Sequence, residues 1–277
     1  TSLTSSALSD LDTLSTAINA SPAQFINATN LETSAVSDSE IDITSSEATI
    51  DSLDAIDEDN IDMTLASGAT INVDASEVTA MLADENEGRF TISDQNITVT
   101  GEISVEDANK LNGTTTGTIT ATIASSSIES LTTLTGTNAY TITIASGDAT
   151  AATAPDLTTI NAKTSLAVNL TNVTGLAASS LSDLGTLATA ISNSEFSNAT
   201  GLTTIAVSDT TIDATTLAAR IDAYDTINGI SGLTDMTLAS GATINVDASE
   251  ITAMLADESA GRLTIDDQVI TVTGAIT

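Results

Sequence analysis

Alternating apolar and polar residues predict a series of short β-strands along the chain. In the run TGTITATI, Ile119, Ala121 and Ile123 fall on one side and threonines on the other, a period of two that is typical of a half-buried strand. The run AYTITIA repeats this pattern. Further strands are predicted near Met63, Ile92, Val168, Ile205, Met236 and Leu263, and second short strands in the runs TINVD and NITVTG.

Apolar residues spaced three and four apart predict short helices between these strands. In DASEVTAMLADE three apolar residues share a face, and Asp74 with Glu77 resembles a capping box. Ser104 is predicted to cap a helix in SVEDANKLNG, which Gly113 would end. The same spacing predicts helices in SSSIESLTTLTG, APDLTTINA and SSLSDLGTLATAI, of which the last is the longest.

A long internal repeat organises these elements. The residues from Asp62 to Gly101 return from Asp235 to Gly274 with six positions changed. Weaker matches extend the correspondence to the start of the sequence. We therefore predict a first repeat unit at residues 1–173, with about six strand-and-helix coils, and a partial second copy at residues 174–277 that is equivalent to 1–104.

Strands that alternate with helices at this spacing favour parallel pairing through right-handed crossovers. Because a coil of about 23–30 residues is too short to fold alone, the coils are expected to stack on one another. The predicted fold class is an α/β solenoid, in which parallel coils stack at roughly 4.8 Å with short helices on one flank. The alternative is a pure right-handed β-solenoid, in which the helix-like runs form strands or loops.

Composition narrows the partners that this chain could have. Its 38 acidic residues face five basic ones, a net charge of −33, so a nucleic-acid backbone is not expected to bind. Self-repulsion keeps copies soluble and would oppose side-by-side packing unless cations, such as divalent ones, screen or bridge the carboxylates. No apolar run approaches the length of a membrane-spanning helix, so no membrane span is predicted.

Cysteine and histidine are both absent, which removes disulfides, thiolate or imidazole metal sites, and nucleophilic schemes that use either residue. Threonine and serine are abundant, at 51 and 33 residues. This acidic, cysteine-free composition is typical of secreted bacterial surface proteins. The sequence begins at Thr1 and stops in a strand-like run, and we expect both ends to continue in a longer polypeptide.

One acidic cluster is a candidate for Ca²⁺, the only cofactor that the sequence suggests. It holds Asp54, Asp57, Glu58, Asp59 and Asp62, together with Asn60. Such oxygen donors suit Ca²⁺, which takes six to eight of them. The second copy keeps Asp222, Asp225, Asn228 and Asp235 but loses the close spacing. This drift favours a solvated acidic loop over a metal site.

Three other patterns have ordinary structural interpretations. The carboxylates Asp84 with Glu85, and Asp94 with Asp267, could do acid/base work, but few aromatic residues are available to hold a sugar, so we predict that the chain is not an enzyme. Threonines at 118, 120, 122, 141 and 143 resemble ice-binding ladders, but the ladder breaks between coils. Several N-x-[S/T] triplets occur, among them those at Asn27, Asn96, Asn112, Asn169, Asn172 and Asn198.

Two long runs, ITVTGEISVEDANKLNGTTTGTITATI and LTGTNAYTITIASGDATAATAPDLTTINAKTSLAVNL, resemble the tandem repeats of giant bacterial cell-surface proteins, such as those of cyanobacteria. The resemblance lies in repeat style and composition. It implies an extracellular structural protein that associates with further copies of its own repeat to form a fibre, sheath or surface layer. The alternatives are an adhesin stalk that spaces a distal binding domain, and a polysaccharide- or ice-binding solenoid.

Overall fold

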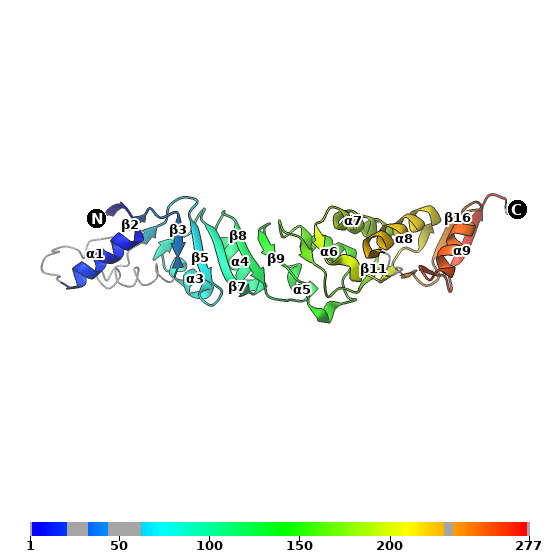
Figure 1. The fold of residues 1–277 in the computed structure, drawn as a ribbon, viewed down its shortest axis with the longest axis horizontal. Coiled ribbons are helices and arrows are strands. Elements are labelled where there is room, and N and C mark those ends of the chain that lie inside the picture. Colours follow the sequence, from blue (N-terminus) through cyan, green and yellow to red (C-terminus); the bar gives the residue numbers. More distant parts are fainter. Residues whose placement is uncertain (1, 21–32, 44–61, 230–234, 276–277) are drawn as a thin grey trace. The chain divides into compact units, whose positions relative to one another are not determined.

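The chain folds into two compact units of mixed helix and strand. The computed structural model describes residues 2–20, 33–43, 62–229 and 235–275 (Figure 1). Unit 1 holds residues 1–124 with 138–140, and unit 2 holds residues 125–137 with 141–277. This division concerns packing within the fold. The predicted repeat boundary between residues 173 and 174 concerns the sequence, and it stays a prediction.

Unit 1 contains two parallel sheets. The first has the strand order β1 (Ser2–Ser6), β2 (Thr33–Val36), β4 (Asp62–Thr64) and β6 (Phe90–Thr91). The second has the order β3 (Glu40–Asp42), β5 (Thr70–Asp74), β7 (Asn96–Ile103), β8 (Ile119–Ile123) and β9 (Ala139–Thr141). Figure 1 shows β5, β7 and β8 running side by side. The helices of this unit are α1 (Leu8–Ala20), α3 (Val78–Asn86) and α4 (Val105–Thr114).

A row of isoleucines forms the inner face of the second sheet. Ile41 pairs with Ile71, Ile71 with Ile97, and Ile97 with Ile119. All four side chains are at most 2% exposed. Because side chains alternate across a strand, the same pairings place polar residues on the outer face. The alternation in the sequence therefore predicts correctly which face of these strands is buried.

Unit 2 repeats this plan. One sheet has the order β11 (Gly175–Ser179), β13 (Thr204–Val207), β15 (Asp235–Thr237) and β17 (Leu263–Thr264); a second has β14 (Thr211–Asp213), β16 (Thr243–Asp247) and β18 (Val269–Thr273); a third pairs β10 (Val168–Asn169) with β12 (Phe196–Ser197). The strands of these three sheets pair in parallel. The helices are α5 (Ile128–Leu131), α6 (Ala154–Asn161), α7 (Leu181–Ser192), α8 (Ala214–Asn228) and α9 (Ile251–Ser259), with 3₁₀ turns at Ser146–Asp148 and Ala199–Gly201.

The helix predictions are confirmed in position and corrected at several ends. Ser104 caps α4 by accepting a hydrogen bond from the backbone N–H of Asp107 at 3.0 Å. Gly113, however, lies inside α4, which continues to Thr114. Asp74 is the last residue of β5 and caps no helix, because a turn intervenes before α3 begins at Val78. Half of the predicted box is still present, since the Glu77 carboxylate accepts from the Asp74 N–H at 3.3 Å.

The longest described helix is not among the helices predicted from the sequence. Helix α8 has 15 residues, against 12 in α7, and it occupies much of the stretch interpreted from its charge as an acidic loop. Its buried residues Leu217, Ile221 and Tyr224 lie four and three apart, which is a helical spacing. The Tyr224 hydroxyl donates to the carbonyl of Leu184 at 3.0 Å and so ties α8 to α7.

The fold class is therefore α/β, built from parallel sheets and short helices. The helix-like runs form helices in the described residues, so the alternative in which they are strands is wrong. The reason is local: capping side chains such as Ser104, Thr153 and Ser180 satisfy the first free N–H groups of α4, α6 and α7.

Candidate functional site

Most of the predicted acidic cluster, including Asp54, Asp57, Glu58, Asp59 and Asn60, lies outside the described residues. Its last member, Asp62, opens β4, where its carboxylate accepts a hydrogen bond from the Thr91 hydroxyl at 3.2 Å. The counterpart Asp235 accepts from Thr264 at 3.0 Å. In both copies this carboxylate joins neighbouring strands.

The second copy brings its acidic residues to an arginine. Asp222 and Asp225 lie on α8, and their carboxylates approach the Arg262 guanidinium at 3.7 Å and 3.2 Å. Asp257 of α9 forms an ion pair with the same guanidinium. Burial raises the pKa of Asp257, Arg262 opposes that rise, and the charges of Asp222 and Asp225 add to it. The arrangement is a joint in which a single arginine, just before β17, holds three carboxylates from α8 and α9.

The first copy contains the core of this joint. The Arg89 guanidinium lies 2.8 Å from the Asp84 carboxylate, at the positions equivalent to Arg262 and Asp257. The backbone agrees as well, because the N–H of each arginine donates to the carbonyl of its aspartate at 2.9 Å. A pair retained in both copies with the same backbone bond is explained by its role in ending α3 and α9.

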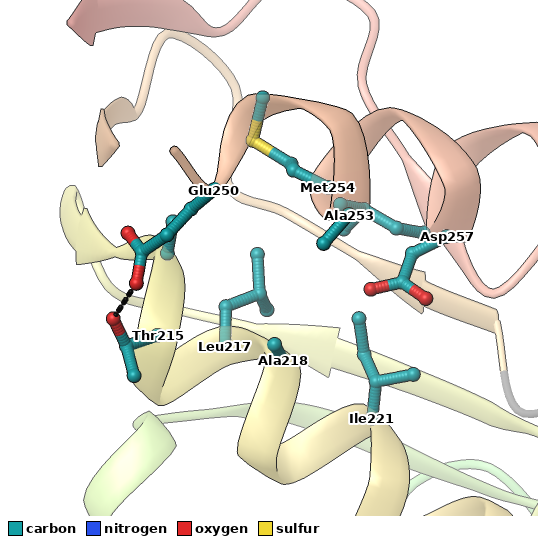
Figure 2. A pocket seen from close by; sticks show the side chains of 10 residues that line it. Thr215, Leu217, Ala218, Ile221, Glu250, Ala253, Met254 and Asp257 are labelled. Atoms are coloured by element: carbon teal, nitrogen blue, oxygen red, sulfur yellow. Dashed lines mark hydrogen bonds between the residues drawn. The ribbon is translucent and has the colours of Figure 1, made fainter. Parts of the chain in front are cut away.

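A cavity of about 130 Å³ lies beside this joint, between α8 and α9. Figure 2 shows Leu217, Ala218 and Ile221 of α8 facing Ala253 of α9, and Met254 also lines the cavity. Glu250 accepts a hydrogen bond from the Thr215 hydroxyl at one end of the cavity, and Asp257 lies at the other (Figure 2). The polar groups of the cavity therefore already bond within the protein, and its remaining lining is apolar. This chemistry suits helix packing better than catalysis.

The two carboxylate pairs considered for acid/base chemistry have other partners. Asp84 is paired with Arg89. Asp94 accepts from the Ser67 hydroxyl at 2.5 Å, and Asp267 from Ser240 at 2.5 Å. These hydrogen bonds lower the pKa of both carboxyls. A general acid at neutral pH needs a raised pKa, so the shift runs in the opposite direction.

The described ranges contain neither a metal-binding cluster nor a membrane-spanning helix. Over residues 2–20, 33–43, 62–229 and 235–275, no three acidic, histidine or cysteine side chains gather in a way that could hold a metal ion. Within the same ranges no helix has the length and apolarity to cross a bilayer.

The asparagines of the N-x-[S/T] triplets mostly bond to neighbouring coils. Asn96 accepts from the Thr118 N–H at 2.9 Å, and Asn172 donates to the carbonyl of Ile144 at 2.8 Å. Asn198 adopts a left-handed backbone with φ of 57° and donates to Asn169 at 2.9 Å. Asn27 lies outside the described residues. These contacts give the asparagines a structural role.

The strand register shows which residues accompany the predicted threonine row. Thr120 pairs with Thr98, Thr98 with Asn72, and Asn72 with Asp42. The outer row is thus mixed, with two threonines, one amide and one carboxylate. A regular threonine ladder is not built on this face of the sheet.

Comparisons of this chain with protein-family models, with curated proteins and with solved structures found no match.

Proposed function

We propose that the chain is an extracellular structural protein whose tandem units stack as an α/β solenoid and build a fibre, sheath or surface layer. The observation that carries the proposal is the recurrence of one construction. Strands β5 and β7 pair at five positions, from Thr70 with Asn96 to Asp74 with Thr100, and β16 and β18 pair at the five equivalent positions. A unit that refolds identically at two places in one chain is suited to building an array.

The arrangement of polar groups supports the same proposal. Among the described residues, several carboxylates that the sequence pattern marked as candidates bond to serine, threonine or arginine side chains, as Asp62, Asp94 and Asp225 do. Buried strand residues such as Met63, Ile71 and Val73 recur in the second copy, whereas the acidic stretch before them drifts. Retained packing beside a drifting acidic stretch favours a scaffold over a duplicated active site.

The net charge of −33 makes assembly sensitive to salt. Electron microscopy of the purified chain across an ionic-strength series tests the proposal. We expect filaments or sheets of uniform axial repeat, which become more abundant as salt shortens the Debye length towards roughly 10 Å at 0.1 M. Single particles at every salt and Ca²⁺ concentration would contradict it, and isolated rods anchored at one end of a cell would favour the adhesin stalk.

Location needs its own measurement. An antibody raised against the chain is expected to label the surface of intact producing cells. Label that enters only after permeabilisation would remove the extracellular part of the proposal.

A further inference from the structure

The sides of the cavity between α8 and α9 are apolar. Leu217, Ala218 and Ile221 line it from α8, and Ala253 of α9 lies opposite (Figure 2). Leu263 of β17 also lines it, and the side chains of Leu217, Ile221 and Leu263 are at most 2% exposed. The volume of about 130 Å³ is close to the roughly 150 Å³ of an apolar protein cavity that binds benzene. A small molecule with an apolar body of that size therefore fits.

The cavity has an opening beside Ala253, which lines it and is itself exposed. The counterpart of this residue in the first copy, Ala80 of α3, is exposed as well. There helix α4 of the following coil packs on α3. Exposure at this helix position therefore occurs with a following coil in place, and the opening does not rely on a bare helix.

One of the six differences between the two copies lies in the wall of the cavity. The first copy has Phe90 where the second has Leu263, and both side chains are 2% exposed. Both residues pair with the preceding strand in the same register, Phe90 with Met63 and Leu263 with Met236. The backbone thus accepts a phenyl group at this position, and the smaller Leu263 leaves part of that space to the cavity.

A carboxylate stands at one end of the cavity. Glu250 lies just before α9; one of its oxygen atoms accepts from the Thr215 hydroxyl and the other from the Asp247 N–H at 3.2 Å. Each oxygen atom of a carboxylate can accept a further hydrogen bond. The described residues include all five lysines and arginines of the chain, and none of them forms an ion pair with Glu250.

The opposite end of the cavity offers no positive charge to an anion. Asp257 lies there, and its carboxylate is paired with the Arg262 guanidinium. Asp222 and Asp225 approach the same guanidinium at 3.7 Å and 3.2 Å. Three carboxylates thus share one guanidinium, and the cavity is bordered by carboxylates at both ends. This arrangement favours a cationic ligand.

The start of helix α8 near Glu250 does not reverse this preference. Free N–H groups at the start of a helix attract anions. Here the Asp213 carboxylate already accepts from the Thr216 N–H at 2.9 Å. The helix start is therefore capped by a carboxylate of the chain itself.

We infer that this cavity binds a small organic cation, in which an ammonium group is attached to an apolar body about as large as a benzene ring. The apolar body lies between Leu217 and Ala253, and the ammonium group donates to the Glu250 carboxylate. The binding site goes beyond the proposed scaffold function, which does not require it, because every residue that lines the cavity belongs to unit 2 of a single chain.

The test uses the full chain with isotope-labelled methionine methyl groups, followed by NMR, with benzylammonium as the probe. We expect benzylammonium to shift the methyl signal of Met254, which lines the cavity, in a saturable way. The signal of Met63, which lies in β4 of unit 1, should not move. Toluene has the same apolar body without the charge and should bind about tenfold more weakly, since it cannot donate to Glu250.

Three variants separate the charge from the cavity. Glu250→Gln should weaken benzylammonium binding about tenfold and leave toluene binding within about twofold, which also shows that the cavity is intact. Glu258→Gln is the matched control, because it removes one charge from an exposed position of α9 outside the cavity lining. Leu263→Phe introduces the residue of the first copy and should weaken binding of both ligands about tenfold or more, because the phenyl group fills the space.

Three results would overturn the inference. The first is the absence of a saturable shift of the Met254 signal. The second is equal affinity for benzylammonium and toluene, which would show a cavity that takes up apolar molecules without recognising charge. The third is an equal loss of benzylammonium binding in Glu250→Gln and Glu258→Gln, which would mean that the ligand is held by the overall negative charge.

Filament formation is scored separately by electron microscopy. Benzylammonium binding without filaments would leave the binding site standing and remove the proposed scaffold function. Filaments without benzylammonium binding would remove the binding site alone.

Discussion

Residues 78–99 and 251–272 differ at six positions and form the same helix and strands, yet their side chains have different surroundings. Met81 and Met254 are both buried, at 0% and 5%, because the strands of their own coil cover them. Leu82 is 7% exposed and Leu255 is 49% exposed, because the coil of residues 104–123 lies over the first and the described residues include no corresponding coil over the second. The backbone of a coil is therefore set by its local sequence and its own core. The exposure of the side chains on its outward face depends on the neighbouring coil.

The largest expected effect is a difference in the free energy of unfolding between truncation of Ile97 and truncation of Ile270. Ile97→Ala should destabilise the chain by about 2–5 kcal/mol, the usual cost of truncating a buried isoleucine. Ile270→Ala should cost less than about 1 kcal/mol, since that side chain is partly in water. Urea unfolding followed by circular dichroism measures both. Equal changes in the free energy of unfolding would contradict the comparison and would mean that Ile270 is buried in solution.

A smaller effect concerns the close approach at Gly117. Gly117→Ala is expected to cost about 1–3 kcal/mol, because the added methyl group must displace the Gln95 backbone. Gly113→Ala lies in α4 with open space around it and should stabilise the helix by about 0.5–1 kcal/mol. Thermal unfolding of both variants gives the sign. If Gly117→Ala leaves the unfolding temperature unchanged, the chain at Gly117 does not lie as close to the Gln95 backbone as in the structure.

The two tyrosines, one in each unit, allow the burial of the two units to be compared through their alkaline titration. Burial raises the pKa of Tyr140 to about 12 and raises that of Tyr224 as well. Both pKa values exceed the unfolded value near 10, so the stability they contribute is complete below about pH 10 and is lost as pH rises towards 12. Ultraviolet absorbance of the phenolate should show no free-tyrosine titration near pH 10.

Tyr140→Phe and Tyr224→Phe assign the signal to each unit. Each variant is expected to halve the alkaline absorbance change. A transition with an ordinary pKa near 10 in either single variant would mean that the remaining tyrosine reaches solvent.

The smallest effect should be the same in both copies. Ser67→Ala and Ser240→Ala remove the hydroxyls that lower the pKa of Asp94 and Asp267, so each carboxyl should return towards its ordinary value. The lowered pKa gives stability that is present above the unfolded value near pH 4 and lost as pH falls through the folded value. Carboxyl NMR titration detects the shift. Different pKa changes in the two copies would show that the neighbouring coil affects the pKa of these carboxyls.

Strand positions and buried faces could be predicted from the sequence where apolar and polar residues alternate. Ile119, Ala121 and Ile123, which alternate with threonines, are an example. Helix starts were predictable where a serine caps, as at Ser104. Gly113 was misleading, since a glycine near a helix end is consistent with continuation as well as termination. Exposure of Ile270 could not be predicted at all, because its local sequence is almost that of the buried Ile97.

Helix α8 shows a different failure. The charges of Asp222 and Asp225 favour a solvated loop, whereas the spacing of Leu217, Ile221 and Tyr224 is helical, and the structure follows the apolar spacing. The ion pairs from these two aspartates to Arg262 could not be deduced, because only the coil geometry brings together residues that lie so far apart in the sequence. The Ca²⁺ hypothesis for residues 54–60 stays a prediction, since those residues lie outside the described ranges.

The isoleucine row of the second sheet also has a consequence for how such a chain can change over generations. The stretch of chain from Ile41 to Ile71 is shorter than the stretch between their counterparts Ile212 and Ile244, yet both pairs occupy the same register. A slip by one residue would turn every side chain to the wrong face, so the register resists change. Insertions and deletions are therefore tolerated between strands and selected against within them, and coils of unequal length can share one lineage.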